Sequence, residues 1–377
     1  MPQRGGDKAD MIKLLHAADL HLDSPFSGLP SGKAAQRRQE QRELPGRLAS
    51  LAEAEQVQLV LLAGDLFDSD SAFTETAEEL IKALGSIAAP VFISPGNHDF
   101  YTASSAYARL PFPENVHIFR DDRIECVELP ELNARVFGAA FTDRSCRGSF
   151  EGFSVEKKAG FTDIMCIHGE LGGDRYRPIT EEQLAASGMD YVALGHVHLE
   201  SGLRRSGETY YAWPGCPEGR GFDETGEKHV YITELGDGEC SIRPVCIAAR
   251  RYGVITADLS DADPLQAVEA ALAADPGIDC CRMILRGETD DAPDTELLRR
   301  SLEDSFFSLQ LRDETTLRRE LWDRAGEDSL RGQFLIRLRA AYDAAKSDAE
   351  REKITQAVRW GLAALDKREE VLTHGDK

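Results

Sequence analysis

The amino-acid sequence predicts an α/β protein in three parts: a large layered domain, a smaller α+β unit and a helical end. From Met11 to about Cys246, short apolar runs alternate with helical stretches, which is typical of α/β layers. Residues 247–313 show the same two kinds of pattern on a smaller scale, and only helical patterns remain over 314–377. We therefore expect a large layered domain at 11–246, an α+β domain at 247–313 and a helical region at 314–377.

The first ten residues, MPQRGGDKAD, are polar and unlike the apolar segment after them. We expect residues 1–10 to form a flexible leader, with Met11 as an alternative start. They lack the apolar segment of a secretory signal, and no apolar run approaches the length of a membrane span. The eight cysteines do not have the spacing of a zinc site, which favours reduced thiols and a cytoplasmic protein without a membrane partner.

Seven apolar runs of the large domain are expected to form strands: MIKLLHAAD, VQLVLLAGD, APVFISPGNHD, ARVFGAAF, FTDIMCIHGE, MDYVALGHVH and KHVYITELG. Helical patterns at about 34–55 and 74–87 lie between them. In the smaller unit, RYGVITADL, CCRMILRGE and FSLQLRDE are expected as strands, with DPLQAVEAALAA and DTELLRRSLEDSF as helices. The vicinal pair Cys280 and Cys281 lies in one of these strands, which favours packing over redox chemistry.

The helical end carries two apolar stripes at helical spacing. One comprises Leu330, Phe334, Leu338, Ala341 and Ala345, and the other comprises Ile354, Val358, Leu362 and Leu365. Docking on a partner and packing against the chain's own domains explain these stripes equally well.

Five polar motifs come directly after strands of the large domain: Asp19-Leu20-His21, Gly64-Asp65, Gly96-Asn97-His98-Asp99, His168-Gly169-Glu170 and Gly195-His196-Val197-His198. Residues i and i+2 of an extended chain point to the same side, so Asp19 and His21 can address one ion. A carboxylate such as Asp65 has two oxygens and can bridge two cations. The carboxyl ends of strands are also where open α/β sheets place their sites.

The residue types in these motifs indicate a metal centre. Five of the nine histidines fall in them, together with carboxylates and an amide but no thiolate. This ligand set suits two divalent ions, with Mn²⁺ preferred and Mg²⁺, Fe²⁺ or Zn²⁺ as alternatives. Each motif alone is also common as a turn or a solvated loop; the ordered set favours metal. Three of the four remaining histidines (His16, His117 and His229) are expected in the core or on the surface. The arginine pairs at 204–205 and 250–251 are expected as solvated charges, with contact to phosphates near the site as the alternative.

The series D-x-H, GD, GNHD, H and GHxH resembles the calcineurin-like metallophosphoesterase superfamily. The stretches DLHLDSPF, GDLFD and WPGCPEGRGFDETGEKH are similar to the SbcD/YhaO-type DNA-repair exonuclease subunits, especially the YhaO-like branch. The resemblance covers Met11 to about Cys246, and the later regions only in overall layout. It implies a four-layer αββα sandwich for the large domain. Residues 247–313 would form a separate cap domain.

Carried over position by position, the resemblance implies two ion sites. One ion would be bound by Asp19, His21, Asp65 and His198, and the other by Asp65, Asn97, His168 and His196. It also implies two catalytic residues: His98, a histidine beside the scissile phosphate that binds no metal, and Asp99, its orienting partner. Two positions depart from the pattern. Asp68 stands where some nuclease relatives have a histidine, and Cys216 stands where serine or asparagine is usual.

The resemblance implies a two-metal DNA nuclease, an exonuclease with single-strand endonuclease action in DNA repair. It further implies a coiled-coil ATPase partner of the SbcC or YhaN kind, and it allows a homodimer. The alternative is a phosphoesterase acting on nucleotides, other small phosphodiesters or phosphoproteins. A net charge of −22 favours this alternative, because an acidic protein does not steer DNA to its surface. A decayed, non-enzymatic scaffold is disfavoured, since buried carboxylates and imidazoles are costly without a metal.

Overall fold

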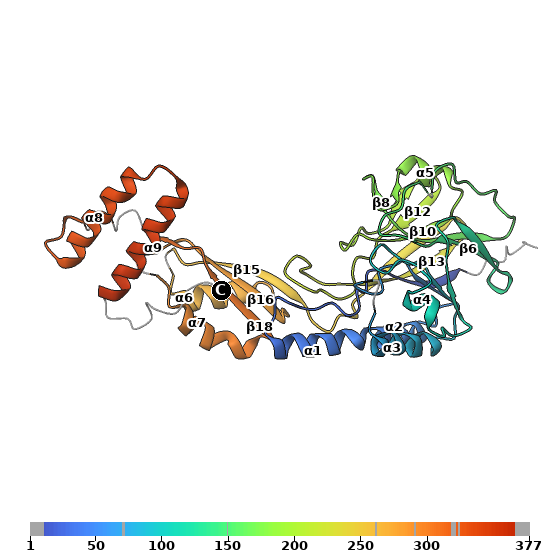
Figure 1. Ribbon diagram of the computed structural model, residues 1–377, viewed down its shortest axis with the longest axis horizontal. Helices are drawn as coiled ribbons and strands as arrows, with labels where there is room; N and C mark the ends of the chain where they lie inside the picture. Colours follow the sequence, from blue (N-terminus) through green and yellow to red (C-terminus); the bar gives the residue numbers. More distant parts are fainter. Residues whose placement is uncertain are drawn as a thin grey trace, which may run out of the picture. The chain divides into compact units, whose positions relative to one another are not determined.

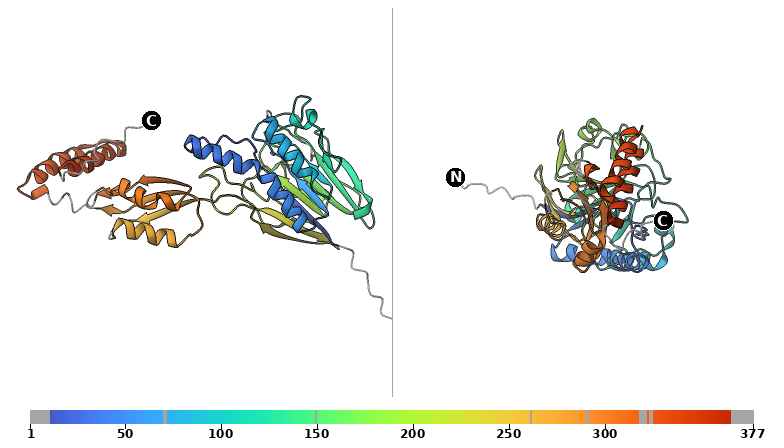
Figure 2. Two further views of the ribbon diagram at one scale, coloured as in Figure 1. Left: turned by 90° about the horizontal axis from the view of Figure 1, so that it is seen from below. Right: turned by 90° about the vertical axis from the view of Figure 1, so that its left-hand side faces the viewer.

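The computed structural model describes residues 11–69, 72–148, 150–260, 262–289, 292–317, 322 and 325–365. The leader expected at 1–10 and the last part of the helical region, 366–377, lie outside the described residues. The chain forms two compact units that divide between Tyr252 and Gly253 (Figures 1 and 2). Among the described helices, none combines the length and the apolar character needed to cross a membrane.

The first unit contains two six-stranded sheets. The first has the order β14-β13-β1-β2-β3-β4 and the second the order β11-β12-β10-β7-β6-β5. The strands of the first are β1 Ile12–Ala17, β2 Leu59–Leu62, β3 Val91–Ile93, β4 Val116–Ile118, β13 Val230–Gly236 and β14 Glu239–Val245. Those of the second are β5 Glu125–Leu129, β6 Ala134–Ala139, β7 Thr162–His168, β10 Tyr191–Gly195, β11 Arg204–Ser206 and β12 Thr209–Ala212.

The helices of the first unit are α1 Ser31–Arg42, α2 Leu44–Ala54, α3 Thr74–Gly85, α4 Ala106–Arg109 and α5 Glu181–Ala186. Helices α2 and α3 cover the outer face of the first sheet and α5 that of the second (Figure 1). The single helix expected at about 34–55 is two helices, because Pro45 lies in the first turn of α2 and lacks the N–H that a continuous helix would need. The helix expected at 74–87 is α3.

Alternate residues of each strand supply separate cores, which produces the layers. Leu14 packs between the two sheets with residues such as Val136, whereas the next residue, Leu15, packs against α2 and α3. The outer face of the second sheet packs against Leu184 of α5. The four-layer αββα sandwich implied by the resemblance is thereby confirmed.

The second unit begins with a three-stranded sheet of order β15-β16-β18. Its elements are β15 Tyr252–Asp258, α6 Pro264–Ala273, β16 Cys280–Arg286, β17 Glu288–Thr289, α7 Thr295–Leu302, a 3₁₀ turn at Glu303–Ser305, β18 Ser308–Asp313 and β19 Thr316–Leu317. Cys280 and Cys281 are buried and free. The expected α+β composition is confirmed; the role of this unit as a cap stays a prediction.

Two helices end the described chain, α8 Leu330–Ala344 and α9 Asp348–Leu365. The two apolar stripes partly face each other: Phe334 and Leu338 of the first stripe pack against a buried cluster formed by Val358 and Leu362 of the second stripe together with Leu335 of α8. Arg359 of α9 donates from Nη2 to the hydroxyl of Thr315 at 2.9 Å. The helices therefore pack on each other and contact the segment directly after β18, while Leu330 and Trp360 are 74% and 55% exposed.

Candidate metal centre

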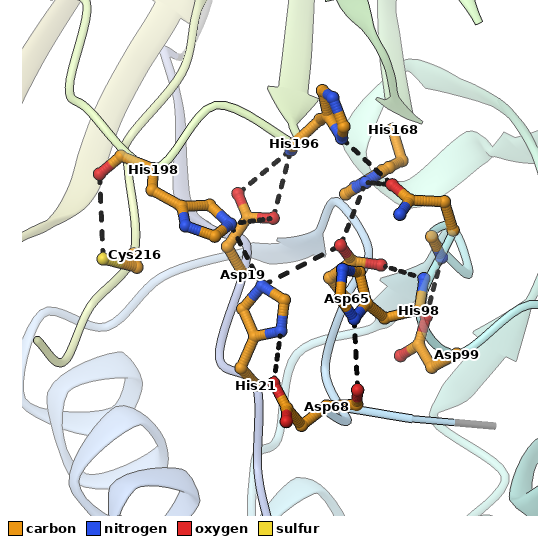
Figure 3. Close-up of polar contacts among 12 residues, drawn as sticks. Asp19, His21, Asp65, Asp68, His98, Asp99, His168, His196, His198 and Cys216 are labelled. Atoms are coloured by element: carbon orange, nitrogen blue, oxygen red, sulfur yellow. Dashed lines mark hydrogen bonds and ion pairs between the residues drawn. The ribbon is translucent and has the colours of Figure 1, made fainter. Parts of the chain in front are cut away.

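The seven expected metal ligands lie together where strands of the two sheets end (Figure 3). Asp19 and His21 follow β1, and Asp65 and Asn97 follow the parallel neighbours β2 and β3. From the second sheet, His168 is the last residue of β7, and His196 and His198 follow β10, which pairs in parallel with β7. Strands that run parallel end at the same edge, which explains how loops far apart in sequence meet.

One group of side chains comprises Asp19, His21 and His198. The Nε2 atoms of His21 and His198 lie 3.1 Å apart, and His198 Nε2 lies 3.9 Å from Asp19 Oδ1. Asp19 and His21 are buried, whereas the His198 side chain is 32% exposed. Asp65 borders this group, with its Oδ2 3.9 Å from His21 Nε2.

A second group comprises Asp65, His168 and His196, with Asn97 between the two imidazoles. Asn97 Oδ1 lies 3.0 Å from His168 Nε2 and 3.0 Å from His196 Nδ1. Asp65 Oδ2 lies 3.4 Å from His168 Nε2. Asp65 is thus near both groups, the position that a bridging carboxylate requires.

The donor atoms of both groups fit divalent cations. At ion–ligand distances of about 2.0–2.2 Å, neighbouring ligands of an octahedral ion lie about 3 Å apart, as several of these pairs do. Two imidazole nitrogens facing each other with their lone pairs repel unless a proton or a cation lies between them. Oxygen and nitrogen ligands without a thiolate also suit Mn²⁺, Mg²⁺, Fe²⁺ or Zn²⁺. The two groups are therefore suited to binding metal ions.

Each of the four histidines has an oxygen near its other ring nitrogen, and for His198 and His168 this contact is a hydrogen bond. His21 Nδ1 lies 3.2 Å from Asp68 Oδ1, and His198 Nδ1 lies 2.8 Å from Glu224 Oε1. His168 Nδ1 lies 2.8 Å from the carbonyl oxygen of Ala63, and His196 Nε2 lies 3.7 Å from Glu170 Oε2. Acceptors at these positions fix the tautomer and orientation of a metal-binding histidine.

The backbone of the site is held in left-handed conformations that side chains rarely adopt. Asp19, His21, Asp65 and His196 have φ values of 55°, 43°, 50° and 93°. Such conformations cost on the order of 1–3 kcal/mol each and persist where surrounding contacts impose them. Here the neighbouring backbone supplies those contacts: Asp19 N–H donates to Gly64 C=O and His21 N–H to Asp65 C=O, both at 2.9 Å.

Two glycines allow the loops to approach each other closely. Gly64 has a φ of 91°, and a Cβ there would lie 2.5 Å from His168 Nδ1. A Cβ on Gly96 would overlap the Asp65 carboxylate. Any larger residue at either position would push a candidate ligand out of place.

Burial and mutual repulsion perturb the ionisation of the site. Burial, together with the nearby charge of Asp65, raises the pKa of Asp19 to about 7. Burial also opposes charge on His168, but the adjacent Asp65 carboxylate outweighs it and raises the His168 pKa to about 9. Burial lowers the pKa of His196 to about 3 and that of His21 to about 4. His21 and His196 are thus neutral near pH 7, the form that binds metal.

His98 lies at the exposed edge of the site. Its backbone N–H donates to Asp65 Oδ1 at 2.9 Å, and its Nδ1 lies 3.1 Å from the carbonyl oxygen of Asp68. The His98 ring contacts the Asp68 carbonyl and packs edge-on against the His21 ring, with ring centroids 4.9 Å apart; the Asp99 side chain is directed to other groups.

Asp99 is buried and joins two loops of the site. Its Oδ2 accepts from the N–H groups of Leu66 at 2.7 Å and Phe67 at 3.2 Å, and from the Tyr107 hydroxyl. Its Oδ1 accepts from Gly96 N–H at 2.8 Å. Burial and the charge of Asp65 raise the pKa of Asp99. These contacts differ from the expected pairing of Asp99 with the His98 ring. Asp99 instead joins the backbone after Asp65 to the backbone just before Asn97 and His98.

Asp68 and the loop between β12 and β13 supply contacts that sequence reasoning missed. Asp68 was noted only as a departure, and Arg220 and Glu224 lay in a stretch noted only for its resemblance. Arg220 Nη1 donates to Asp68 Oδ1 at 3.0 Å and Nη2 donates to Glu224 Oε1 at 2.6 Å. Asp68, His21 and His98 form a third cluster of metal-type residues. The adjacent guanidinium already neutralises Asp68, so we assign this cluster to positioning, not to a further ion.

Other residues singled out from the sequence lie where packing or surface pairing explains them. Cys216 is buried with its Sγ 3.7 Å from the His198 carbonyl oxygen, and burial raises its pKa to about 12, so it fills space as an inert thiol. His16 is buried between the sheets, and Arg205 and Arg250 pair with Glu208 and Glu40.

Comparison with known proteins agrees with this geometry. The chain matches the family of calcineurin-like phosphoesterases over residues 12–200. It is 31% identical over 244 residues to the uncharacterized metallophosphoesterase YhaO of Bacillus subtilis, covering 61% of this chain and 59% of the relative. It is 25% identical over 271 residues to the D subunit of the nuclease SbcCD of Bacillus subtilis, covering 60% and 67%. It is 22% identical over 271 residues to the DNA double-strand break repair protein Mre11 of Saccharolobus solfataricus, covering 65% and 66%.

The alignments leave a third or more of each relative unmatched: the chain spans between 59% and 67% of their lengths. The family match includes all seven residues of the two side-chain groups, from Asp19 to His198, and extends over half of the chain. The chain therefore belongs to the calcineurin-like phosphoesterase family.

Proposed function

We propose that this chain is a two-metal-dependent phosphodiesterase that acts on DNA as a nuclease. The observation that carries the proposal is the position of Asp65 between two groups of nitrogen and oxygen donors, with the exposed His98 beside them. One ion would be held by Asp19, His21, Asp65 and His198, and the other by Asp65, Asn97, His168 and His196. We propose Mn²⁺ as the ion for both sites, with Mg²⁺, Fe²⁺ and Zn²⁺ as alternatives.

When bound, two such ions activate water and offset the negative charge of a phosphodiester. The chain's own residues position the reaction. Asp68 occupies Nδ1 of His98 through its carbonyl oxygen, so Nε2 is the nitrogen that remains for a substrate oxygen. His98 can then stabilise developing charge and donate a proton to the leaving oxygen. Asp99 contributes indirectly, because it fixes the loop that carries His98.

The choice of DNA as substrate is supported by the names of two relatives, a nuclease subunit and a double-strand break repair protein. We propose an exonuclease, with single-strand endonuclease action as a second activity, that works in DNA repair in the cytoplasm. A coiled-coil ATPase is the proposed partner. Leu330, Ile336 and Trp360 of α8 and α9 are exposed apolar side chains that such a partner would cover. A homodimer also remains compatible with this proposal.

The alternative function is hydrolysis of nucleotides or other small phosphodiesters. The net charge of −22 favours it, because a strongly acidic surface repels a polyanion. The experiment compares linear double-stranded DNA, single-stranded DNA, nucleotides and bis(p-nitrophenyl) phosphate in the presence of Mn²⁺. The nuclease proposal expects DNA to be cleaved with the highest kcat/KM, and it is wrong if only the small esters turn over. His98→Ala serves as the inactive variant, and His229→Ala, at a mostly buried histidine outside the donor groups that is paired with Glu200, as its matched control.

A further inference from the structure

Arg220 lies in the loop between β12 and β13, beside the metal centre but outside its set of donors. Its Nη1 donates to Asp68 Oδ1 at 3.0 Å. Its Nη2 donates to Glu224 Oε1 at 2.6 Å, and its Nε donates to Glu224 Oε2 at 3.1 Å. The Arg220 side chain is 21% exposed, and Glu224 is 6% exposed. The guanidinium therefore directs its donors to two carboxylates that come from different loops.

These two carboxylates are the ones that contact the histidines of the first ion site. Asp68 Oδ1 lies 3.2 Å from His21 Nδ1, and Glu224 Oε1 lies 2.8 Å from His198 Nδ1. Arg220 Nη2 lies 3.2 Å from His198 Nδ1, but with the Nδ1 proton directed to Glu224 the two nitrogens are both donors, so Glu224 is the group that links Arg220 to His198. The opposite nitrogens of the two imidazoles, both Nε2, face each other at 3.1 Å. A closed ring of contacts thus runs from one histidine through Arg220 to the other.

The two carboxylates explain why a positively charged side chain lies between them. Two carboxylates that share a partly buried region repel each other, so each can turn away from the histidine beside it. A planar guanidinium binds both in fixed directions, which a single ammonium group cannot do. Held in these directions, Glu224 accepts a hydrogen bond from Nδ1–H of His198, and Asp68 Oδ1 lies beside Nδ1 of His21 at 3.2 Å. Both Nε2 atoms are then unprotonated ligand atoms.

We propose that Arg220 is the positioning residue of the ion site formed by Asp19, His21 and His198, and that it sets the tautomer and direction of both histidines through Asp68 and Glu224. The inference deepens the proposed function, since it rests on the same pair of ion sites. It also explains the departure at Asp68: an acidic residue at this position can accept from Arg220 and from His21 together, which a histidine cannot.

The surroundings of Arg220 favour positioning over direct contact with a substrate phosphate. A phosphate-binding arginine needs donors directed to solvent, whereas Nε, Nη1 and Nη2 of Arg220 all have carboxylate acceptors. The loop is also anchored at its base, where the buried Glu218 accepts from Arg37 at 2.6 Å and Arg47 at 3.0 Å. Arg220 with its two carboxylates, Asp68 and Glu224, is here called the clamp. Contacts outside the ion sites therefore hold the clamp in place.

The effect of Arg220 extends to the exposed histidine. The backbone carbonyl of Asp68 lies 3.1 Å from His98 Nδ1, so the residue whose side chain binds Arg220 also orients His98 through its main chain. A substitution at Arg220 should therefore change the orientation of His21 and His198 most, and that of His98 less. The second ion site, with partners Ala63 and Glu170 on its histidines, does not include the clamp.

The test is Mn²⁺ binding to metal-free protein, measured by calorimetry and by electron paramagnetic resonance. The variants are Arg220→Met, which keeps length and removes the donors, and Arg220→Lys, which keeps a charge but not the planar fork. Arg205→Met, at an exposed arginine paired with Glu208, is the matched control. We expect wild type and Arg205→Met to bind two ions in one spin-coupled pair. In Arg220→Met one ion should bind with unchanged affinity and the other about 10- to 100-fold more weakly, with Arg220→Lys recovering only part of the loss.

A second measurement separates positioning from general loss of structure. Nitrogen-15 shifts of the histidines in metal-free wild type should show Nδ1–H tautomers for His21 and His198, and Arg220→Met should show mixed tautomers. Wild-type affinity for both ions in Arg220→Met, or equal weakening of both, would overturn the inference. These results do not depend on cleavage: a wild type that binds two ions but leaves DNA intact contradicts the nuclease proposal and leaves the role of Arg220 standing.

Discussion

Asp99 offers the sharpest test of how this site is held together, because its buried carboxylate can be changed to an amide of nearly the same shape. In the structure, Oδ2 accepts from Leu66 N–H, Phe67 N–H and the Tyr107 hydroxyl, and Oδ1 accepts from Gly96 N–H. An asparagine has one acceptor oxygen. If that oxygen keeps the three bonds of Oδ2, the amide NH₂ group faces Gly96 N–H, and two donors oppose each other.

The size of the effect follows from these bonds. Leaving the buried Gly96 N–H without an acceptor costs about 1–3 kcal/mol, and bonds to a charged acceptor are stronger than bonds to a neutral one by about 1 kcal/mol each. We therefore expect Asp99→Asn to lower the free energy of unfolding by about 3–5 kcal/mol, a large part of the about 5–15 kcal/mol typical of a domain. Tyr107→Phe removes one of the four bonds and should cost about 1–2 kcal/mol.

The assay is urea unfolding with a chelator present, so that metal binding does not add to stability. Hydrogen exchange of the peptides that contain residues 64–67 and 96–99 shows whether the loss is local to the two loops. Asp121→Asn is the matched control, since that exposed carboxylate accepts from Arg123 N–H at 2.9 Å; it should unfold like wild type. An Asp99→Asn protein that is as stable as wild type but inactive would refute this reasoning, because Asp99 would then act on the reaction and not on the loops.

Three further predictions concern the centre and the core. His98→Ala should keep both ions, measured by metal analysis, and lose about 10²–10⁴-fold in kcat, since only the proton donor is removed; wild-type turnover would rule out that role. Asp65→Ala should lose affinity for both ions, because Asp65 borders both donor groups; retention of one tightly bound ion would contradict bridging. His16 is buried against the Tyr191 hydroxyl, and burial lowers its pKa from 6.5 to about 3. Because the pKa of His16 is lower in the folded state than in the unfolded state, only the unfolded state takes up a proton between about pH 6.5 and 3. The free energy of unfolding is therefore unaffected by His16 above about pH 6.5 and falls by about 1.4 kcal/mol per pH unit as the pH drops from there toward 3. His16→Gln should flatten this dependence in urea unfolding at pH 4–8, and an unchanged slope would show that His16 is not its source.

The layered fold and the meeting of the candidate ligands could be predicted because they depend on local sequence signals. Strands buried on both faces are apolar throughout, as in LVLL of β2, and parallel strands end at the same edge. Motifs that follow such runs must then be close in space, as Asp65 and His168 are. The break between α1 and α2 was missed because the amphipathic pattern continues through it, although Pro45 was a visible signal.

The parts that could not be predicted depend on long-range contacts. Left-handed conformations are expected at glycine, yet Asp19 and Asp65 adopt them where backbone hydrogen bonds join their loops, and His196 adopts one where its N–H donates to the Asp19 carboxylate. The acceptors behind the histidines follow no spacing rule either. Asp68 and Glu224 are 156 positions apart by number, and Arg220 binds both. The donors of a metal site leave a motif, since each must follow a strand at a set spacing, but the groups that orient those donors can come from any loop that reaches them. The sequence thus indicates which atoms face an ion, whereas the structure is needed to show what holds them there. For this chain the answer is a charged clamp that a substitution at Arg220 should loosen without touching any ligand.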